Sequence, residues 1–69
     1  MIKCHLSTLM GLNKLKIADV ARETGLNRST ITALYQETAK RIELDAINEL
    51  CKLLNCTVSD LIEYIPDEQ

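Results

Sequence analysis

The chain has 69 residues, 46% of them hydrophobic, which predicts one folded domain over residues 1–69 and excludes a separate catalytic or small-molecule effector domain. Phe and Trp are absent, so the core must be built from smaller side chains, which favours thin helices packed closely together. The net charge of −2 hides an asymmetry: residues 1–42 carry seven basic and three acidic residues (+4), and residues 43–69 carry one and seven (−6). Such a distribution fits a basic face for phosphate groups, and equally well two ordinary solvated halves.

The first elements are expected to be a short strand and a short helix. Residues 2–6 alternate between apolar and polar side chains, which predicts an edge strand. A helix over residues 6–13 should follow and bury Leu6, Leu9 and Met10. Its last turn contains Gly11, which weakens a helix interior by about 1 kcal/mol relative to alanine.

The next segment predicts two helices joined by a sharp turn. The first helix runs over residues 17–24 and ends at Gly25, which supplies the left-handed conformation that closes a helix. Its start is weakly marked, because Lys16 has no oxygen with which to cap it. Asn27 is a good N-cap for the second helix, over residues 28–36.

The clearest amphipathic stripe in the chain predicts a helix over residues 44–54. The residues of the stripe are Leu44, Ile47, Leu50, Cys51 and Leu54. Asn55 suits the C-terminal cap of this helix.

The end of the chain predicts one more helix and an extended segment. Thr57 and Asp60 approximate a capping box for a short helix over residues 59–63. Residues 64–65 are expected to be extended and to pair with the strand at residues 2–5.

Six residues occupy the positions that a helix-turn-helix requires. A small residue lets the two helices cross closely, a glycine makes the turn, and apolar residues hold the second helix against the first. These residues are Val20, Ala21, Gly25, Leu26, Ile31 and Leu34. One such position means little, whereas all six at fixed offsets indicate the motif.

On these residues the chain resembles the Cro and lambda-repressor type of helix-turn-helix domain (the XRE family), a family of small bacterial and phage transcriptional regulators. The resemblance extends over the helix at residues 44–54 and the segment from Cys56 to Leu61. It implies an all-α, compact five-helix, lambda-repressor-like fold that binds double-stranded operator DNA, commonly as a dimer. In such domains the second helix of the motif lies in the major groove.

The outward face of the second motif helix is expected to contact DNA bases. With about 100° per residue, and with Ile31 and Leu34 facing inward, this face carries Ser29, Thr32, Ala33 and Gln36. Arg28 flanks the face and is also expected to contact a base. Arginine can bind guanine O6 and N7, and glutamine can bind adenine N6 and N7, each with about 1–3 kcal/mol of discrimination. On an isolated helix the same side chains would be ordinary solvent-facing residues, and the motif makes DNA contact the better interpretation.

Residues at the ends and flanks of the motif are expected to contact phosphate groups. They are Lys14, Lys16, Asn27, Thr30, Tyr35, Lys40 and Arg41. Tyr35 fits the edge of the core as well as a phosphate contact, and the pair Lys40–Arg41 also fits a solvated turn. Glu37 argues against phosphate nearby, because a carboxylate is repelled there unless it binds a cytosine amine.

Three features depart from the family pattern or limit affinity. Many members begin the first motif helix with Thr-Gln, where this chain has Lys16 and Ile17, and isoleucine cannot make the polar contacts of glutamine. The Asn-Gly turn after the second motif helix is replaced by Gln36–Glu37, which predicts a longer or less tightly turned exit. The modest basic count allows only about four to six phosphate contacts per half-site, so that useful binding requires a homodimer.

The cysteines and the histidine do not form a metal or cofactor site by sequence. Cys51 and Cys56 are not at a C-x-x-C spacing, and His5 beside Cys4 would need carboxylates to complete a metal site. Three cysteines cannot pair completely, so thiols in a reducing cytoplasm are expected. No secretory segment is recognisable, and no apolar stretch approaches the ~18 residues of a membrane span, so a membrane is not expected as a partner.

An enzyme is disfavoured, because His5 is the only histidine and there is no glycine-rich phosphate loop. The competing interpretation is a protein-interaction module of the same fold (an antitoxin, an anti-repressor or a partner subunit) that acts through the acidic C-terminal half. DNA binding requires the basic residues to gather around an exposed second motif helix, whereas the alternative requires that face to pack against protein. The helix over residues 44–54 and the strand edges are candidate dimer surfaces.

Overall fold

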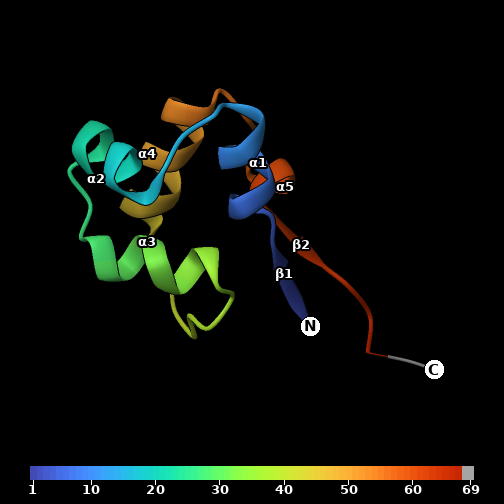
Figure 1. The fold of residues 1–69 in the computed structure, drawn as a ribbon. Coiled ribbons are helices and arrows are strands. Elements are labelled where there is room, and N and C mark those ends of the chain that lie inside the picture. The colour runs from blue at the N-terminus through green and yellow to red at the C-terminus, as the bar shows by residue number, and fades with distance from the viewer. Residues whose placement is uncertain (68–69) are drawn as a thin grey trace.

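The computed structural model describes residues 1–67, and the last two residues of the domain predicted over 1–69 lie outside this range. In residues 1–67, five helices surround one core and a two-stranded sheet extends from them (Figure 1). The elements in chain order are β1 (Ile2–Cys4), α1 (Leu6–Leu12), α2 (Ile17–Thr24), α3 (Arg28–Tyr35), α4 (Leu44–Leu54), α5 (Val58–Leu61) and β2 (Ile62–Tyr64). The predicted five-helix fold is confirmed.

Every helix contributes to a single aliphatic core. Its most deeply buried side chains are Leu6, Met10, Val20, Ile31, Leu50 and Leu61. Removing side chains of this kind from water contributes about 1.5–3 kcal/mol each. Leu9, which was expected to be buried, lies half-buried at the edge of this core.

Three predicted helix caps are confirmed, two at the C-terminal ends of α2 and α4 and one at the start of α5. Gly25 has φ 75°, and its N–H donates to the carbonyl of Ala21 at 2.9 Å, which ends α2. Asn55 has φ 52° and ψ 52° and ends α4 in the same left-handed conformation. At the start of α5, the N–H of Asp60 donates to the hydroxyl of Thr57 at 3.2 Å, and the N–H of Thr57 donates to the carboxylate of Asp60 at 3.0 Å.

The boundary between α5 and the last strand differs from the prediction. The antiparallel pairing of the chain ends is confirmed, with Ile2 opposite Tyr64 and Cys4 opposite Ile62. The predicted helix over residues 59–63 is wrong at both ends: α5 begins one residue after its cap and ends at Leu61. The carbonyl of Leu61 accepts a hydrogen bond from the N–H of His5 at 2.7 Å, so pairing with β1 replaces the next helical turn.

Both ends of α3 depart from the expectations. Asn27 occupies the N-cap position with an extended backbone, but its side chain makes no capping hydrogen bond. The prediction of a longer or looser exit is wrong. Glu37 has φ 59°, its N–H donates to the carbonyl of Leu34 at 3.2 Å, and the N–H of Thr38 donates to the carbonyl of Ala33 at 2.9 Å. This is a tight Schellman turn in which glutamate takes the place usual for glycine.

Candidate nucleic-acid interface

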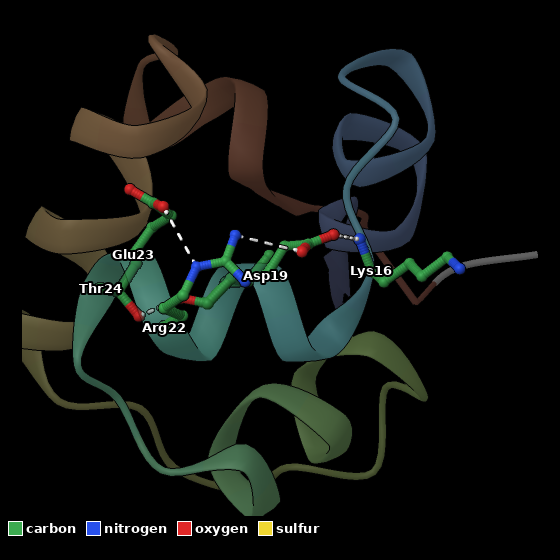
Figure 2. A network of polar contacts seen from close by, with 6 residues as sticks. Lys16, Asp19, Arg22, Glu23 and Thr24 are labelled. Atoms are coloured by element: carbon green, nitrogen blue, oxygen red, sulfur yellow. Dashed lines mark hydrogen bonds and ion pairs between the residues drawn. The ribbon is translucent and has the colours of Figure 1, made fainter.

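A threonine hydroxyl fixes the turn between α2 and α3. The hydroxyl of Thr24 donates to the carbonyl of Val20 at 2.7 Å and accepts a hydrogen bond from the N–H of Leu26 at 3.2 Å. Thr24 lies at the end of α2, as Figure 2 shows, and Leu26 packs against the core. Thr24 was not predicted from the sequence, although a threonine just before a helix-ending glycine is a recognisable signal for a hydroxyl that bonds back to the carbonyl four residues earlier.

The start of α2 is held by Asp19 rather than by a capping side chain at Lys16. The N–H of Lys16 donates to Oδ2 of Asp19 at 2.9 Å, and Nη2 of Arg22 lies 3.3 Å from Oδ1 of the same carboxylate (Figure 2). The backbone hydrogen bond from Lys16, and secondarily the charge of Arg22, lower the pKa of Asp19. Arg22 also contacts Glu23 at 3.4 Å, so two carboxylates face its charge. The side chain of Lys16 extends away from this network and is exposed.

Ile17 has a structural role at the place where many relatives carry glutamine. Its side chain is half-buried and packs against the hydrophobic core. The polar contact that glutamine would offer is therefore replaced by an apolar contact that anchors the start of α2.

The outward face of α3 is open to solvent. Ile31 and Leu34 are buried in the core, as expected. The predicted base-contacting residues lie on the remaining surface: Arg28, Ser29 and Gln36 are exposed, and Thr32 and Ala33 are half-buried. Arg28 forms no ion pair with the residues that the structure describes. The face is therefore neither sealed inside the domain nor neutralised by acids of its own surface.

The acid that argued against phosphate binding is directed to the sheet. Oε1 of Glu37 accepts a hydrogen bond from the N–H of Cys4 at 3.3 Å, and Oε2 lies 3.6 Å from Nζ of Lys3. These contacts engage both oxygens of the carboxylate with β1. Glu37 thus connects α3 to the sheet, and Lys3 lies close to its charge.

The structure brings part of the predicted phosphate-contacting set together at the start of α3. Asn27, Thr30 and Arg41 line a hollow of about 460 Å³, with Glu43 as the one carboxylate among its lining residues. The loop from α3 to α4 therefore places a guanidinium beside the first turn of α3. Free backbone N–H groups at such a helix start favour an anion.

The other predicted phosphate-contacting residues lie on separate parts of the surface. Lys14 is exposed in the loop between α1 and α2, where it has φ 56°. Lys40 is exposed in the loop between α3 and α4. Tyr35 is 42% exposed at the end of α3, so that its hydroxyl is not confined to the core edge.

The cysteines and His5 have local partners. All three thiols are free, and Cys56 contacts Cys51 across the end of α4. Burial, followed by the neighbouring Cys51 thiol, raises the pKa of Cys56 to about 11. Nε2 of His5 lies 2.7 Å from Oε1 of Glu63, and no group of three or more potential metal ligands occurs within residues 1–67.

None of the helices in this part of the chain is long and apolar enough to cross a membrane.

The fold and the α2–turn–α3 arrangement define a helix-turn-helix DNA-binding domain. The model of the Cro/C1-type HTH DNA-binding domain family matches residues 5–67, and the chain belongs to this family. The chain is also 25% identical over 64 residues to the uncharacterized HTH-type transcriptional regulator YozG of Bacillus subtilis strain 168, a match that covers 93% of this chain and 76% of that protein. The family resemblance drawn from the sequence is confirmed, and this family is a class of DNA-binding regulator domains, not of enzymes.

Proposed function

We propose that this chain is a sequence-specific transcriptional regulator that inserts α3 into the major groove of operator DNA and binds as a homodimer. One observation carries the proposal: the inner face of α3 is fixed in the core by Ile31 and Leu34, while the opposite face is polar and accessible. A rigid helix with a free polar face is what reading of base edges requires.

The length of this face matches a short DNA half-site. The residues from Arg28 to Gln36 span about 12 Å along the helix axis, since each residue adds about 1.5 Å. This length corresponds to about three to four base pairs at ~3.4 Å each. Arg28 at one end suits guanine, Gln36 at the other suits adenine, and the methyl group of Ala33 between them suits the methyl group of thymine. Ser29 and Thr32 can bind either base type.

Phosphate contacts would fix the orientation of α3 in the groove. Asn27, Thr30 and Arg41 around the hollow at the start of α3 suit one strand. Lys14, Lys16, Tyr35 and Lys40, which are exposed elsewhere around the motif, are the further candidates. Because few cations are involved, the affinity of a monomer should be low and should fall less steeply with salt than that of a dimer with twice as many phosphate contacts.

We infer a homodimer from this low affinity, because a dimer on two half-sites makes twice as many contacts with DNA as a monomer on one. The strands β1 and β2 form a sheet of only two strands, so each has an outer edge that a second chain can pair with. The α4 helix offers another candidate surface through Leu44, which is 81% exposed. The protein is expected to act in a reducing cytoplasm, where its free thiols would persist.

The alternative role as a protein-interaction module would use the same α3 face or the acidic C-terminal half against another protein. Selection of bound fragments from a random duplex library separates the two roles. The proposal predicts enrichment of one short sequence in two inverted copies, at a spacing of whole helical turns. Recovery of unenriched DNA, or no retention at low salt, would contradict the proposal and favour the interaction role.

A further inference from the structure

A second hollow, of about 280 Å³, lies between the sheet and the loop that follows α3. Most of its wall is apolar, and its lining residues are Ile2, Cys4, Leu34, Glu37, Ala39, Lys40, Arg41, Ile42 and Ile62. The volume is near the lower end of the range of about 300–1,000 Å³ that is usual for small-ligand sites. An apolar hollow with a few polar groups at one side is the general form of such a site.

The apolar wall consists of two opposed surfaces. The strand register places Cys4 opposite Ile62, and Ile2 belongs to the same face of β1 as Cys4, so that this face of the sheet forms one side. Leu34 of α3 and Ile42 of the following loop belong to the helical body. Ile2 remains 63% exposed, so the domain itself does not cover the whole of this surface.

The charged side of the hollow favours an anion. Lys40 and Arg41 form no ion pair within residues 1–67. The carboxylate of Glu37, the one acid among the lining residues, is engaged by Lys3 and by the backbone of β1. Two cations without a partner therefore stand beside the apolar wall, and a guanidinium binds a carboxylate through two parallel hydrogen bonds.

We propose that this hollow binds a small aliphatic carboxylate, with its hydrocarbon chain between the sheet and Leu34 and its carboxylate on Lys40 and Arg41. The consequence for DNA rests on the proposed function, in which the same two residues contact phosphate. A carboxylate that occupies these cations competes with DNA, so the ligand acts as an effector that weakens operator binding. The coupling is reciprocal, and bound DNA weakens ligand binding by the same factor.

Protection of Cys4 from alkylation tests the site without DNA. The probe is octanoate below its micelle concentration, the reagent is iodoacetamide, and the extent of labelling of each cysteine is read by peptide mass. At about ten times its dissociation constant, octanoate should slow the alkylation of Cys4 by about tenfold. Cys51 and Cys56 lie at the end of α4, outside the hollow, and their rates should not change. Octylamine, which has the same chain length and the opposite charge, should give no protection.

Two kinds of variant locate the ligand. Ala39 lines the hollow and is exposed, so A39M should fill the space without disturbing the core and should abolish protection by octanoate. R41Q should also abolish protection, because it removes one of the two cations. Equal protection of Cys4 in the wild type, A39M and R41Q would overturn the site. Slower alkylation of Cys4 at higher protein concentration, without octanoate, would also overturn the ligand site. It would show that a second copy of the chain covers the hollow.

A duplex titration separates the effector from the regulator itself. A39M should bind DNA as the wild type does, because Ala39 is not among the expected DNA-contacting residues. Octanoate should weaken DNA binding of the wild type only, because the hollow of A39M is filled and does not accept octanoate. If Cys4 is protected but no duplex binds, the site stands and the proposed function fails. If a duplex binds with a sequence preference but Cys4 is not protected, the proposed function stands and the ligand site is overturned.

Discussion

The carboxylate of Glu37 accepts a hydrogen bond from the backbone N–H of Cys4 at 3.3 Å and thereby joins the end of α3 to β1. Glu37 holds this position with φ 59°, in the left-handed region, which costs a residue other than glycine about 1–2 kcal/mol. The ion pair with Lys3 at 3.6 Å adds a second contact to the same strand. These contacts offset the strain and orient the end of α3 against the sheet.

Replacing Glu37 by glycine and by alanine separates the strain from the contacts. Both substitutions remove the carboxylate, but only glycine adopts positive φ without a steric penalty. E37G should therefore be more stable than E37A by about 1 kcal/mol in urea unfolding. Equal stability of the two variants would show that the left-handed conformation of residue 37 does not persist in solution.

The hydroxyl of Thr24 is expected to stabilise the helix-turn-helix. T24V keeps the shape of the side chain but leaves the partly buried N–H of Leu26 without its acceptor, and should lower the free energy of unfolding by about 1–3 kcal/mol. T24S retains the hydroxyl and serves as the matched control, and its free energy of unfolding should fall much less. A T24V variant as stable as T24S would mean that this hydrogen bond contributes nothing.

The elements with local signals could be predicted from the sequence. The bounds of α2 and α4 were predicted correctly, because Gly25 and Asn55 end these helices through their own backbone conformations. The boundary of α5 was not predicted correctly, because the carbonyl of Leu61 accepts a hydrogen bond from the N–H of His5, near the other end of the chain. The tight exit of α3 was missed for a similar reason. Its compensating contacts come from residues more than thirty positions away, which no local pattern reveals.

In the candidate interface, too, the features set by local sequence could be predicted and those set by distant contacts could not. Which residues of α3 face outward follows from helical periodicity once Ile31 and Leu34 are assigned to the core, and the structure agrees on both buried residues. The placement of Arg41 and Asn27 around one hollow could not be predicted, because it depends on the path of a loop without regular structure.

Acid should weaken the fold through Asp19. Its pKa is lowered from the ordinary value of 3.8 in the folded state, so around that pH the unfolded chain binds more protons. The stabilisation is therefore complete above the ordinary value and is lost as the pH falls through the folded value. The stability difference between the wild type and D19N, measured by urea unfolding from pH 7 to pH 3, should shrink below about pH 4. A difference that is the same at every pH would contradict this role. Asp60, whose pKa is also lowered by hydrogen bonds from Thr57, remains in both proteins.

Lys40 is expected to contact phosphate and to add affinity without specificity. K40A should weaken binding to all duplexes about equally and reduce the salt slope by about 1. K52A is the matched control, because Lys52 lies on α4 beside Glu49 at 3.9 Å and is outside the candidate interface. Unchanged affinity and slope in K40A, or the same loss in K52A, would contradict the assignment.

The central claim is that the exposed face of α3 reads DNA bases, and titration of R28A with two duplexes tests it most directly. One duplex carries the sequence enriched from the random library, and the other is its scrambled version. Arg28 is exposed and has no ion pair with the described residues, so R28A should fold normally. We expect R28A to lose about 1–3 kcal/mol of the preference for the selected duplex and to bind the scrambled duplex almost as the wild type does. An unchanged preference, or an equal loss on both duplexes, would contradict the claim.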